Sequence, residues 1–198
     1  MPMISERVEL ARQGRNDTVV CRLPSGWVVL ADVQVLRGWS ILLPDPVVPS
    51  LNDLDHDRRA EFLRDMARLG DAILAITGAE RINYEILGNS EPELHAHVVP
   101  RYASEPAERR RLPVWFYDWD AAPRYDPKTS ADLREALRQA LIAAAHFLTH
   151  RETQRPRPVS VRAGVMRLHN EDLAVLGDDA ALPKTIPPTG EERAGSRE

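Results

Sequence analysis

The stretch GNSEPELHAHVVPRY, residues 88 to 102, holds the side chains of this sequence that are best suited to chemistry. His95 and His97 stand two residues apart, and Glu93 stands two residues before His95. Apolar residues alternate with them, as in a β-strand whose successive side chains point to opposite faces. Alternation therefore predicts one face that carries these three polar residues and a second, apolar face that packs in the core.

Three interpretations of the polar face are open, and the first is a solvent-facing strand with two incidental histidines. The second is a metal site. However, an extended strand rises about 3.3 Å per residue, so Glu93 and His97 lie about 13 Å apart along it. A closed site would need ligands from elsewhere, and no other cluster of His, Cys or Asp in the sequence offers them. We therefore predict no metal ion held by the protein side chains.

The third interpretation is nucleophilic catalysis. An imidazole that a neighbouring group aligns can attack phosphorus and carry the phosphoryl or nucleotidyl group as a covalent intermediate. Such chemistry needs amide and hydroxyl donors that hold the phosphate oxygens. Gly88, Asn89 and Ser90 precede the histidines in the same stretch, and Asn83 lies in the strand before it. These residue types supply the donors that the mechanism requires.

The surrounding sequence predicts an antiparallel sheet with a long helix against it. Runs rich in β-branched residues are separated by turn residues, of which Pro24-Ser25-Gly26 predicts a hairpin. A helix is expected from about His56 to Thr77, capped by Asp53 or Asp55 and ended by Gly78. Its apolar residues, at spacings of three and four, are Phe62, Met66, Leu69, Ile73 and Ile76. The expected strands are Thr18–Leu23, Trp27–Ala31, Gly38–Leu43, Arg81–Leu87 and Leu94–Tyr102.

A second helix is expected from Ser130, as its N-cap, to about His150, followed by a largely irregular tail. We divide the chain into a domain of residues 1–125 and a C-terminal extension of residues 126–198. The fold class is α+β, with a sheet of about five antiparallel strands and a packed helix.

Composition narrows the class of protein. The net charge of -4 predicts no general affinity for nucleic acid or for an anionic membrane surface. No apolar run is long enough to cross a bilayer, and the first residues have no signal-peptide pattern. The single cysteine, Cys21, excludes a disulfide within the chain and a Cys-rich zinc site. We expect a cytoplasmic protein.

In the order of its motifs, the sequence resembles the histidine triad (HIT) superfamily over about residues 15 to 120. It offers GWSILLPDPVVPSLNDL, then the long helix, then NYEILGNS, and then ELHAHVVPR. The family pattern has a glycine-led strand that ends at a proline, a helix, an Asn-bearing strand, a Gly-Gln-Ser-like loop and His-x-His-x-His. The resemblance implies a HIT-like fold, nucleotide binding and a homodimer.

The resemblance also implies roles for single residues. His95 holds the middle position of the triad, which in the family attacks the α-phosphate. His97 holds the last position, which contacts the phosphate and the leaving group. Asn83, Asn89 and Ser90 match the polar residues that bind phosphate in the family.

Three further residues are placed around the nucleotide by the same resemblance. Asp32, with Gln34 near it, falls where the family's first hairpin meets the ribose and base. Trp115 belongs to an aromatic cluster, PVWFYDW, that follows the motif and either forms a wall for the base or seals a dimer or core. The arginine run 109–111, together with Arg101, either attracts phosphates or is a solvated loop.

The sequence departs from the family pattern at two positions. Glu93 stands at the first histidine, and Trp39 stands where a histidine often follows the glycine. A carboxylate there either orients His95, as part of a catalytic pair, or repels the incoming phosphate.

The resemblance implies an enzyme that hydrolyses or transfers at the α-phosphate of a nucleotide derivative. The substrate class is a dinucleoside polyphosphate or a nucleoside phosphoramidate, and the intermediate is a nucleotidyl-histidine. The alternative is a nucleotide-binding sensor or adaptor without turnover. The sequence requires no cofactor, although a divalent cation such as Mg²⁺ can accompany the nucleotide.

Overall fold

The computed structural model describes residues 3–153, and the expected irregular tail lies outside the described residues. The helices are α1 (Ile4–Arg12), α2 (His56–Thr77), α3 (Ala107–Arg110) and α4 (Ala131–Thr153), with short 3-10 turns at Leu51–Asp53 and Val114–Phe116. The strands are β1 (Val19–Leu23), β2 (Gly26–Leu30), β3 (Ser40–Pro44), β4 (Arg81–Glu85) and β5 (Ala96–Arg101). None of the helices in this range is long and apolar enough to cross a membrane.

The five strands form one antiparallel sheet in the order β1-β2-β3-β5-β4. The predicted α+β fold, with five antiparallel strands and a packed helix, is therefore confirmed, and the predicted strand bounds differ from the observed ones at their ends. The histidine-bearing strand β5 lies between β3 and the edge strand β4. A central position gives β5 hydrogen-bonded neighbours on both sides, which holds its side chains in a fixed orientation.

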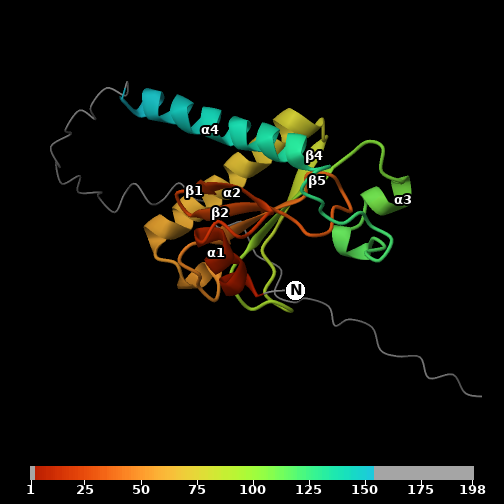
Figure 1. The fold of residues 1–198 in the computed structure, drawn as a ribbon, viewed down its shortest axis with the longest axis horizontal. Helices are drawn as coiled ribbons and strands as arrows, with labels where there is room; N and C mark the ends of the chain where they lie inside the picture. Colours follow the sequence, from red (N-terminus) through yellow and green to blue (C-terminus); the bar gives the residue numbers. More distant parts are fainter. Residues whose placement is uncertain (1–2, 154–198) are drawn as a thin grey trace, which may run out of the picture. The chain divides into compact units, whose positions relative to one another are not determined.

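One face of the sheet is covered by α2, with α4 beside it (Figure 1). Asp55 caps α2 by accepting a hydrogen bond from the Arg58 backbone N–H at 2.9 Å, and Gly78, with φ of 69°, ends the helix. The predicted apolar stripe of α2 lies in this core. The same core contains the strand residues Val28, Leu42, Ala96 and Val98, and Leu94 from just before β5. Helix α4 adds Leu133, Leu137 and Leu141. Helix α4 therefore packs in the same hydrophobic core as α2 and the sheet.

The other face of the sheet is covered by α1 and by a long loop with aromatic residues, which meet in a second core. The sequence interpretation missed α1. Its buried residues Ile4, Val8 and Ala11 have the spacing of one helical face, so a signal was present, but it spans only two turns. This helix matters because it closes one side of the cavity described next.

Candidate active site

A cavity of about 300 Å³ lies on the α1 side of the sheet, over β3 and β5. Both histidines of the motif line it, and they are almost completely buried. The remaining lining residues come from α1, the loop after β2, the loop before β5 and the aromatic segment (residues 112–119). They are Ile4, Arg7, Ala31, Asp32, Val33, Trp39, Ile41, Leu87, Asn89, Ser90, Glu91, Trp115 and Trp119. We call this space the histidine cavity.

His95 is oriented by the backbone beside it. Its Nδ1 lies 2.7 Å from the carbonyl oxygen of Glu93. A carbonyl only accepts hydrogen bonds, so Nδ1 carries the proton and donates it, and the lone pair of the neutral ring is at Nε2. Nε2 forms no hydrogen bond with the described residues. The ring is thus fixed in the tautomer that leaves a nucleophilic nitrogen free.

His97 lies against His95, with their ring centroids 4.8 Å apart and the rings nearly perpendicular. Burial lowers the pKa of His97 to about 3, with smaller contributions from His95 and Arg7. His97 is therefore neutral at pH 7. Its Nδ1 is buried and has no hydrogen-bond partner among the described residues, which leaves a polar atom for a ligand.

Three of the four tryptophans of the chain surround the histidines. Trp115 and Trp119 are stacked, with 5.4 Å between ring centroids and 11° between ring planes. Trp39 meets both of them edge-on, at 5.6 Å and 5.2 Å, and lies 5.6 Å from the His97 ring. These rings form an apolar, aromatic wall beside the histidines. We call them the tryptophan wall.

The loop that carries Trp39 depends on Gln34 and Gly38. Gly38 has φ of 97°, a conformation that favours glycine. The Gln34 amide donates to the carbonyls of Ala31 and Trp39 at 2.8 and 3.0 Å, and its oxygen accepts from the Gly38 N–H at 2.9 Å. Gln34 does not line the histidine cavity. Its hydrogen bonds brace the loop, and its place beside the ribose and base stays a prediction.

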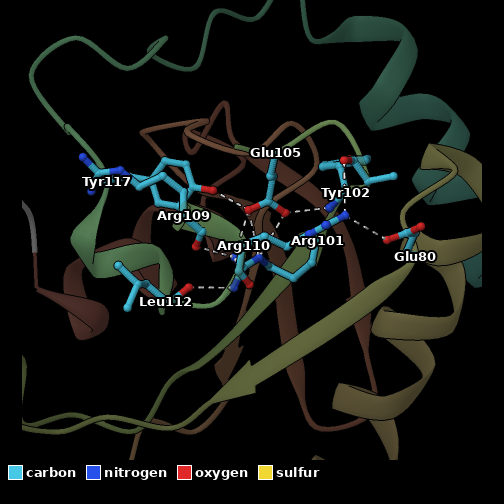
Figure 2. A network of polar contacts seen from close by, with 9 residues as sticks. Glu80, Arg101, Tyr102, Glu105, Arg109, Arg110, Leu112 and Tyr117 are labelled. Carbon is cyan, nitrogen blue, oxygen red and sulfur yellow. Dashed lines mark hydrogen bonds and ion pairs between the residues drawn. The ribbon is translucent and has the colours of Figure 1, made fainter. Parts of the chain in front are cut away.

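The aromatic segment is held in place by a buried network around Arg101, which Figure 2 shows. The Arg101 guanidinium donates to both carboxylate oxygens of Glu105 at 2.9 to 3.1 Å, and this pair is almost fully buried. It also donates to the backbone carbonyls of Arg109, Arg110 and Leu112. β5 is thereby tied to the loop that enters the aromatic segment, only four residues after His97.

Glu105 links the same network to the tryptophan wall. Its carboxylate accepts hydrogen bonds from the Tyr102 backbone N–H and from the Tyr117 hydroxyl, which lies between the two wall tryptophans in sequence. Burial raises the pKa of Glu105, but the hydrogen bonds from Arg101 and Tyr117 outweigh it and the pKa is lowered overall. Burial, together with the bond to Glu105, raises the pKa of Tyr117 to about 12. The ion pair is thus maintained across the neutral range.

Asp32 lines the histidine cavity and is paired with a residue of α1. Arg7 donates to Asp32 at 2.6 and 3.1 Å, and its side chain is buried while that of Asp32 is one-third exposed. The sequence interpretation missed Arg7 because it missed α1. The guanidinium contributes to lowering the pKa of His97, so it lies near the histidines.

Glu93 occupies a different place from the one predicted. Its carboxylate does not line the histidine cavity and instead accepts a hydrogen bond from the Ser5 backbone N–H, in the first turn of α1, at 2.7 Å. Met3, the N-cap of α1, provides no side-chain cap. The predicted catalytic pair of carboxylate and His95 is therefore corrected: Glu93 aligns His95 through its backbone carbonyl, and its carboxylate caps α1.

The loop before β5 brings Asn89 and Ser90 to the histidine cavity, and Gly88 belongs to the same loop without lining it. Glu91, which the sequence interpretation did not single out, also lines it. One carboxylate oxygen of Glu91, the Trp39 indole N–H and Arg7 Nε are buried without a hydrogen-bond partner in residues 3–153. Together with His97 Nδ1, unpartnered polar atoms therefore concentrate at this cavity, as expected of a site for a polar ligand.

Asn83 is the predicted phosphate-binding residue that the structure separates from the others. It pairs with Val99 across β4 and β5 and lines another cavity, which contains four arginines. No group of three or more His, Cys, Asp or Glu side chains within residues 3–153 is arranged to hold a metal ion.

Comparisons with known proteins agree with the architecture. No family model matches the sequence, and no curated protein matches it. A histidine triad protein from Bradyrhizobium japonicum has a similar structure, with 26% identity over 65% of this chain and 94% of that one and a TM-score of 0.56. Histidine triad proteins from Marinobacter aquaeolei (23% identity, 63% and 88% covered, TM-score 0.56) and Sinorhizobium meliloti (23%, 67% and 93%, 0.53) share the fold.

The fold of this chain is the histidine triad (HIT-like) fold. The resemblance inferred from the order of the motifs is confirmed by the likeness to these solved structures. In the sequence, Glu93 stands two residues before His95, and Trp39 follows Gly38, which precedes β3.

Proposed function

We propose that this protein hydrolyses or transfers at the α-phosphate of a nucleotide derivative, of the dinucleoside polyphosphate or nucleoside phosphoramidate class. The observation that carries the proposal is His95, a buried histidine whose Nδ1–H is fixed on the Glu93 carbonyl while Nε2 remains free in a cavity. That arrangement suits a nucleophile, because the lone pair is directed by a hydrogen bond that does not compete for it.

The reaction has two steps. Nε2 of His95 attacks the α-phosphorus, a P–N bond to the histidine forms, and the P–O or P–N bond to the leaving group breaks. Asn89 and Ser90 supply amide and hydroxyl donors for the phosphate oxygens, and the tryptophan wall supports the base. Water, or a phosphate acceptor, then attacks the same phosphorus and releases the mononucleotide while the P–N bond breaks. A divalent cation such as Mg²⁺ accompanies the substrate where its phosphates require one.

The proposal is tested with the wild-type protein and a His95→Ala variant. Incubation with a dinucleoside polyphosphate and with a nucleoside phosphoramidate should release the mononucleotide from at least one of them. Rapid quenching should trap an acid-labile nucleotidyl group on the protein. We expect the variant to lose at least about 10³-fold in turnover and to retain nucleotide binding. Turnover near the wild-type rate in the variant would contradict the mechanism.

One observation favours the second candidate function, a nucleotide-binding sensor or adaptor. His97 is neutral at pH 7 because burial lowers its pKa to about 3, so His97 carries no extra proton to donate to a leaving group. The alternative would be supported if the protein binds a mononucleotide tightly, forms no product from either substrate class and yields no trapped intermediate.

A further inference from the structure

A second cavity, of about 570 Å³, lies beside the edge strand β4. Its lining residues are Glu80, Arg81, Asn83, Arg101, Arg110, Arg111, Leu112 and Pro113. We call it the arginine cavity. Four of its eight lining residues are arginines, whereas the chain as a whole has a net charge of -4. Positive charge is therefore concentrated at this cavity, although the chain as a whole carries a net negative charge.

Two of the four arginines have no ionic partner within the described residues. Arg101 is neutralised by Glu105, but Arg81 and Arg111 form no ion pair or side-chain hydrogen bond with any residue of 3–153. Glu80 is the one acid of the cavity, and its contact with Arg110 is 4.0 Å long with both side chains about half exposed. Such an exposed pair is weak. A concave surface with this imbalance focuses an attractive potential for anions.

The arginines of the run 109–111 lie in two different places. Figure 2 shows the network that contains Arg109 and Arg110. Arg109 donates to the Phe116 carbonyl and lies over the Tyr117 ring, on the side of the aromatic segment. The backbone carbonyls of residues 109, 110 and 112, which would repel an anion, are hydrogen-bonded to Arg101. The side chains of Arg110 and Arg111 then remain at the cavity.

Asn83 adds a neutral donor to the same place. Its amide lines the arginine cavity and forms no side-chain hydrogen bond with the described residues. We propose that the arginine cavity is an anion site that binds a phosphate-bearing group, through the guanidinium groups of Arg81 and Arg111 and the Asn83 amide. Guanidinium groups pair with phosphate oxygens through two parallel N–H···O bonds, and an amide N–H completes the coordination of an oxyanion.

The strand register relates the two cavities. Glu85, Asn83 and Arg81 lie on one face of β4, opposite His97, Val99 and Arg101 of β5. At about 3.3 Å per residue, the arginine cavity lies about 7 to 13 Å from His97 along the sheet. Trp115, which lines the histidine cavity, donates a hydrogen bond to Glu85 of the same strand β4. The bound phosphate therefore has two possible sources: the far end of a substrate held in the histidine cavity, or a free phosphate-bearing effector.

The experiment measures binding of inorganic phosphate and pyrophosphate to the full chain at low salt, by calorimetry and by amide chemical shifts. The double variant Arg81→Gln/Arg111→Gln removes two charges and keeps polar side chains. Arg64→Gln is the matched control, because Arg64 is an exposed arginine of α2. We expect the double variant to weaken binding of these anions by at least about tenfold, and the control by less than about twofold. Shifts on binding should include the amides of residues 81, 83 and 111.

Two results of this experiment would contradict the proposed anion site. Shifts confined to Asn89, Ser90 and His95, or equal affinity in the double variant and wild type, would overturn the proposal. Where the site is upheld, substrate kinetics identify the source. If the double variant raises the KM for a dinucleoside polyphosphate and leaves the KM for a phosphoramidate unchanged, the bound phosphate is the far end of the substrate. This assignment rests on the proposed function. Unchanged KM for both assigns a free effector. The binding of phosphate and pyrophosphate is measured without turnover, so the test of the site itself holds even if neither substrate is turned over.

Discussion

The two faces of the sheet differ in what covers them and in how much of each the sequence reveals. The α2 face is packed with aliphatic side chains and has a helix along its length. The α1 face is covered by a short helix and a loop, and between them lie the histidines and the tryptophan wall. The difference is present within single strands: Leu42 packs under α2, whereas its neighbour Ile41 lines the histidine cavity. Stability and function are therefore assigned to alternate residues of the same strands.

The largest expected effect distinguishes these two neighbours in β3. Leu42 is fully buried in the helix-covered core, so Leu42→Ala should lower the free energy of unfolding by about 4 kcal/mol. Ile41→Ala should cost less than about 2 kcal/mol, because its side chain already borders an open cavity. The measurement is urea denaturation of both variants.

The nucleotide affinity of the two variants should follow the opposite order from their stability. Ile41→Ala enlarges the histidine cavity and should weaken nucleotide affinity, while Leu42→Ala should leave the affinity of the folded fraction unchanged. Equal losses of stability in the two variants would show that the α1 face is as tightly packed as the α2 face.

The second prediction compares two buried carboxylates, one for each face. Glu105 is paired with Arg101 beneath the aromatic segment, and Asp65 accepts hydrogen bonds from Ser25 and Arg68 at the α2 face. Glu105→Gln and Asp65→Asn should each lower the free energy of unfolding by about 3 kcal/mol, because each leaves buried donors without a charged acceptor.

The two variants should differ in readouts that a purely structural role does not affect. Glu105→Gln should shift the tryptophan emission and raise the nucleotide Kd, since it loosens the segment that carries Trp115 and Trp119. Asp65→Asn should change neither. If both variants shift the emission equally, the network around Arg101 does not position the wall specifically.

Much of the α2 face could be predicted from the sequence, since its signals are local and periodic. Helix α2 begins and ends where Asp55 and Gly78 place it, and Leu94, Ala96 and Val98 share the face that alternation assigned to them. His95 and His97 were likewise found from spacing and from motif order, and both line one cavity.

The rest of the α1 face could not be predicted, because it depends on contacts between residues distant in sequence. The Glu93 carboxylate finds its partner 88 residues away, at Ser5. Arg7 pairs with Asp32, 25 residues later, and Asn83 lines a cavity to which Arg110 and Arg111 contribute from nearly 30 residues later. Glu93 lies before β5, which begins at Ala96, so strand alternation does not determine the direction of its carboxylate.

The third prediction concerns pH. Because burial lowers the folded-state pKa of His97 to about 3, the unfolded chain binds a proton near pH 6.5 that the folded chain does not bind. The stability that His97 contributes is complete above about pH 6.5 and is lost as pH falls toward 3. Between pH 6.5 and 5, the free energy of unfolding of the wild type should fall by about 1.5 kcal/mol more than that of His97→Gln. His56→Gln, at an exposed histidine of α2, is the control and should behave as wild type; parallel pH profiles for all three proteins would contradict the burial of a neutral His97.

The smallest expected effect tests the corrected role of Glu93. If its carboxylate caps α1, Glu93→Ala should lower the free energy of unfolding by about 1 kcal/mol, and Glu93→Gln by less, because an amide oxygen still accepts from Ser5. The loss should be local: hydrogen exchange should accelerate in the first turn of α1 in Glu93→Ala.

Turnover should remain within about threefold of wild type in both Glu93 variants, because the backbone carbonyl that fixes His95 is unchanged by either substitution. The two assays therefore separate a helix cap from a catalytic carboxylate. A loss of turnover of about a hundredfold or more in Glu93→Gln, with unaltered exchange in α1, would show that the carboxylate acts on His95. A cap instead predicts faster exchange in α1 with turnover retained, which would place Glu93 among the residues that hold the α1 face together.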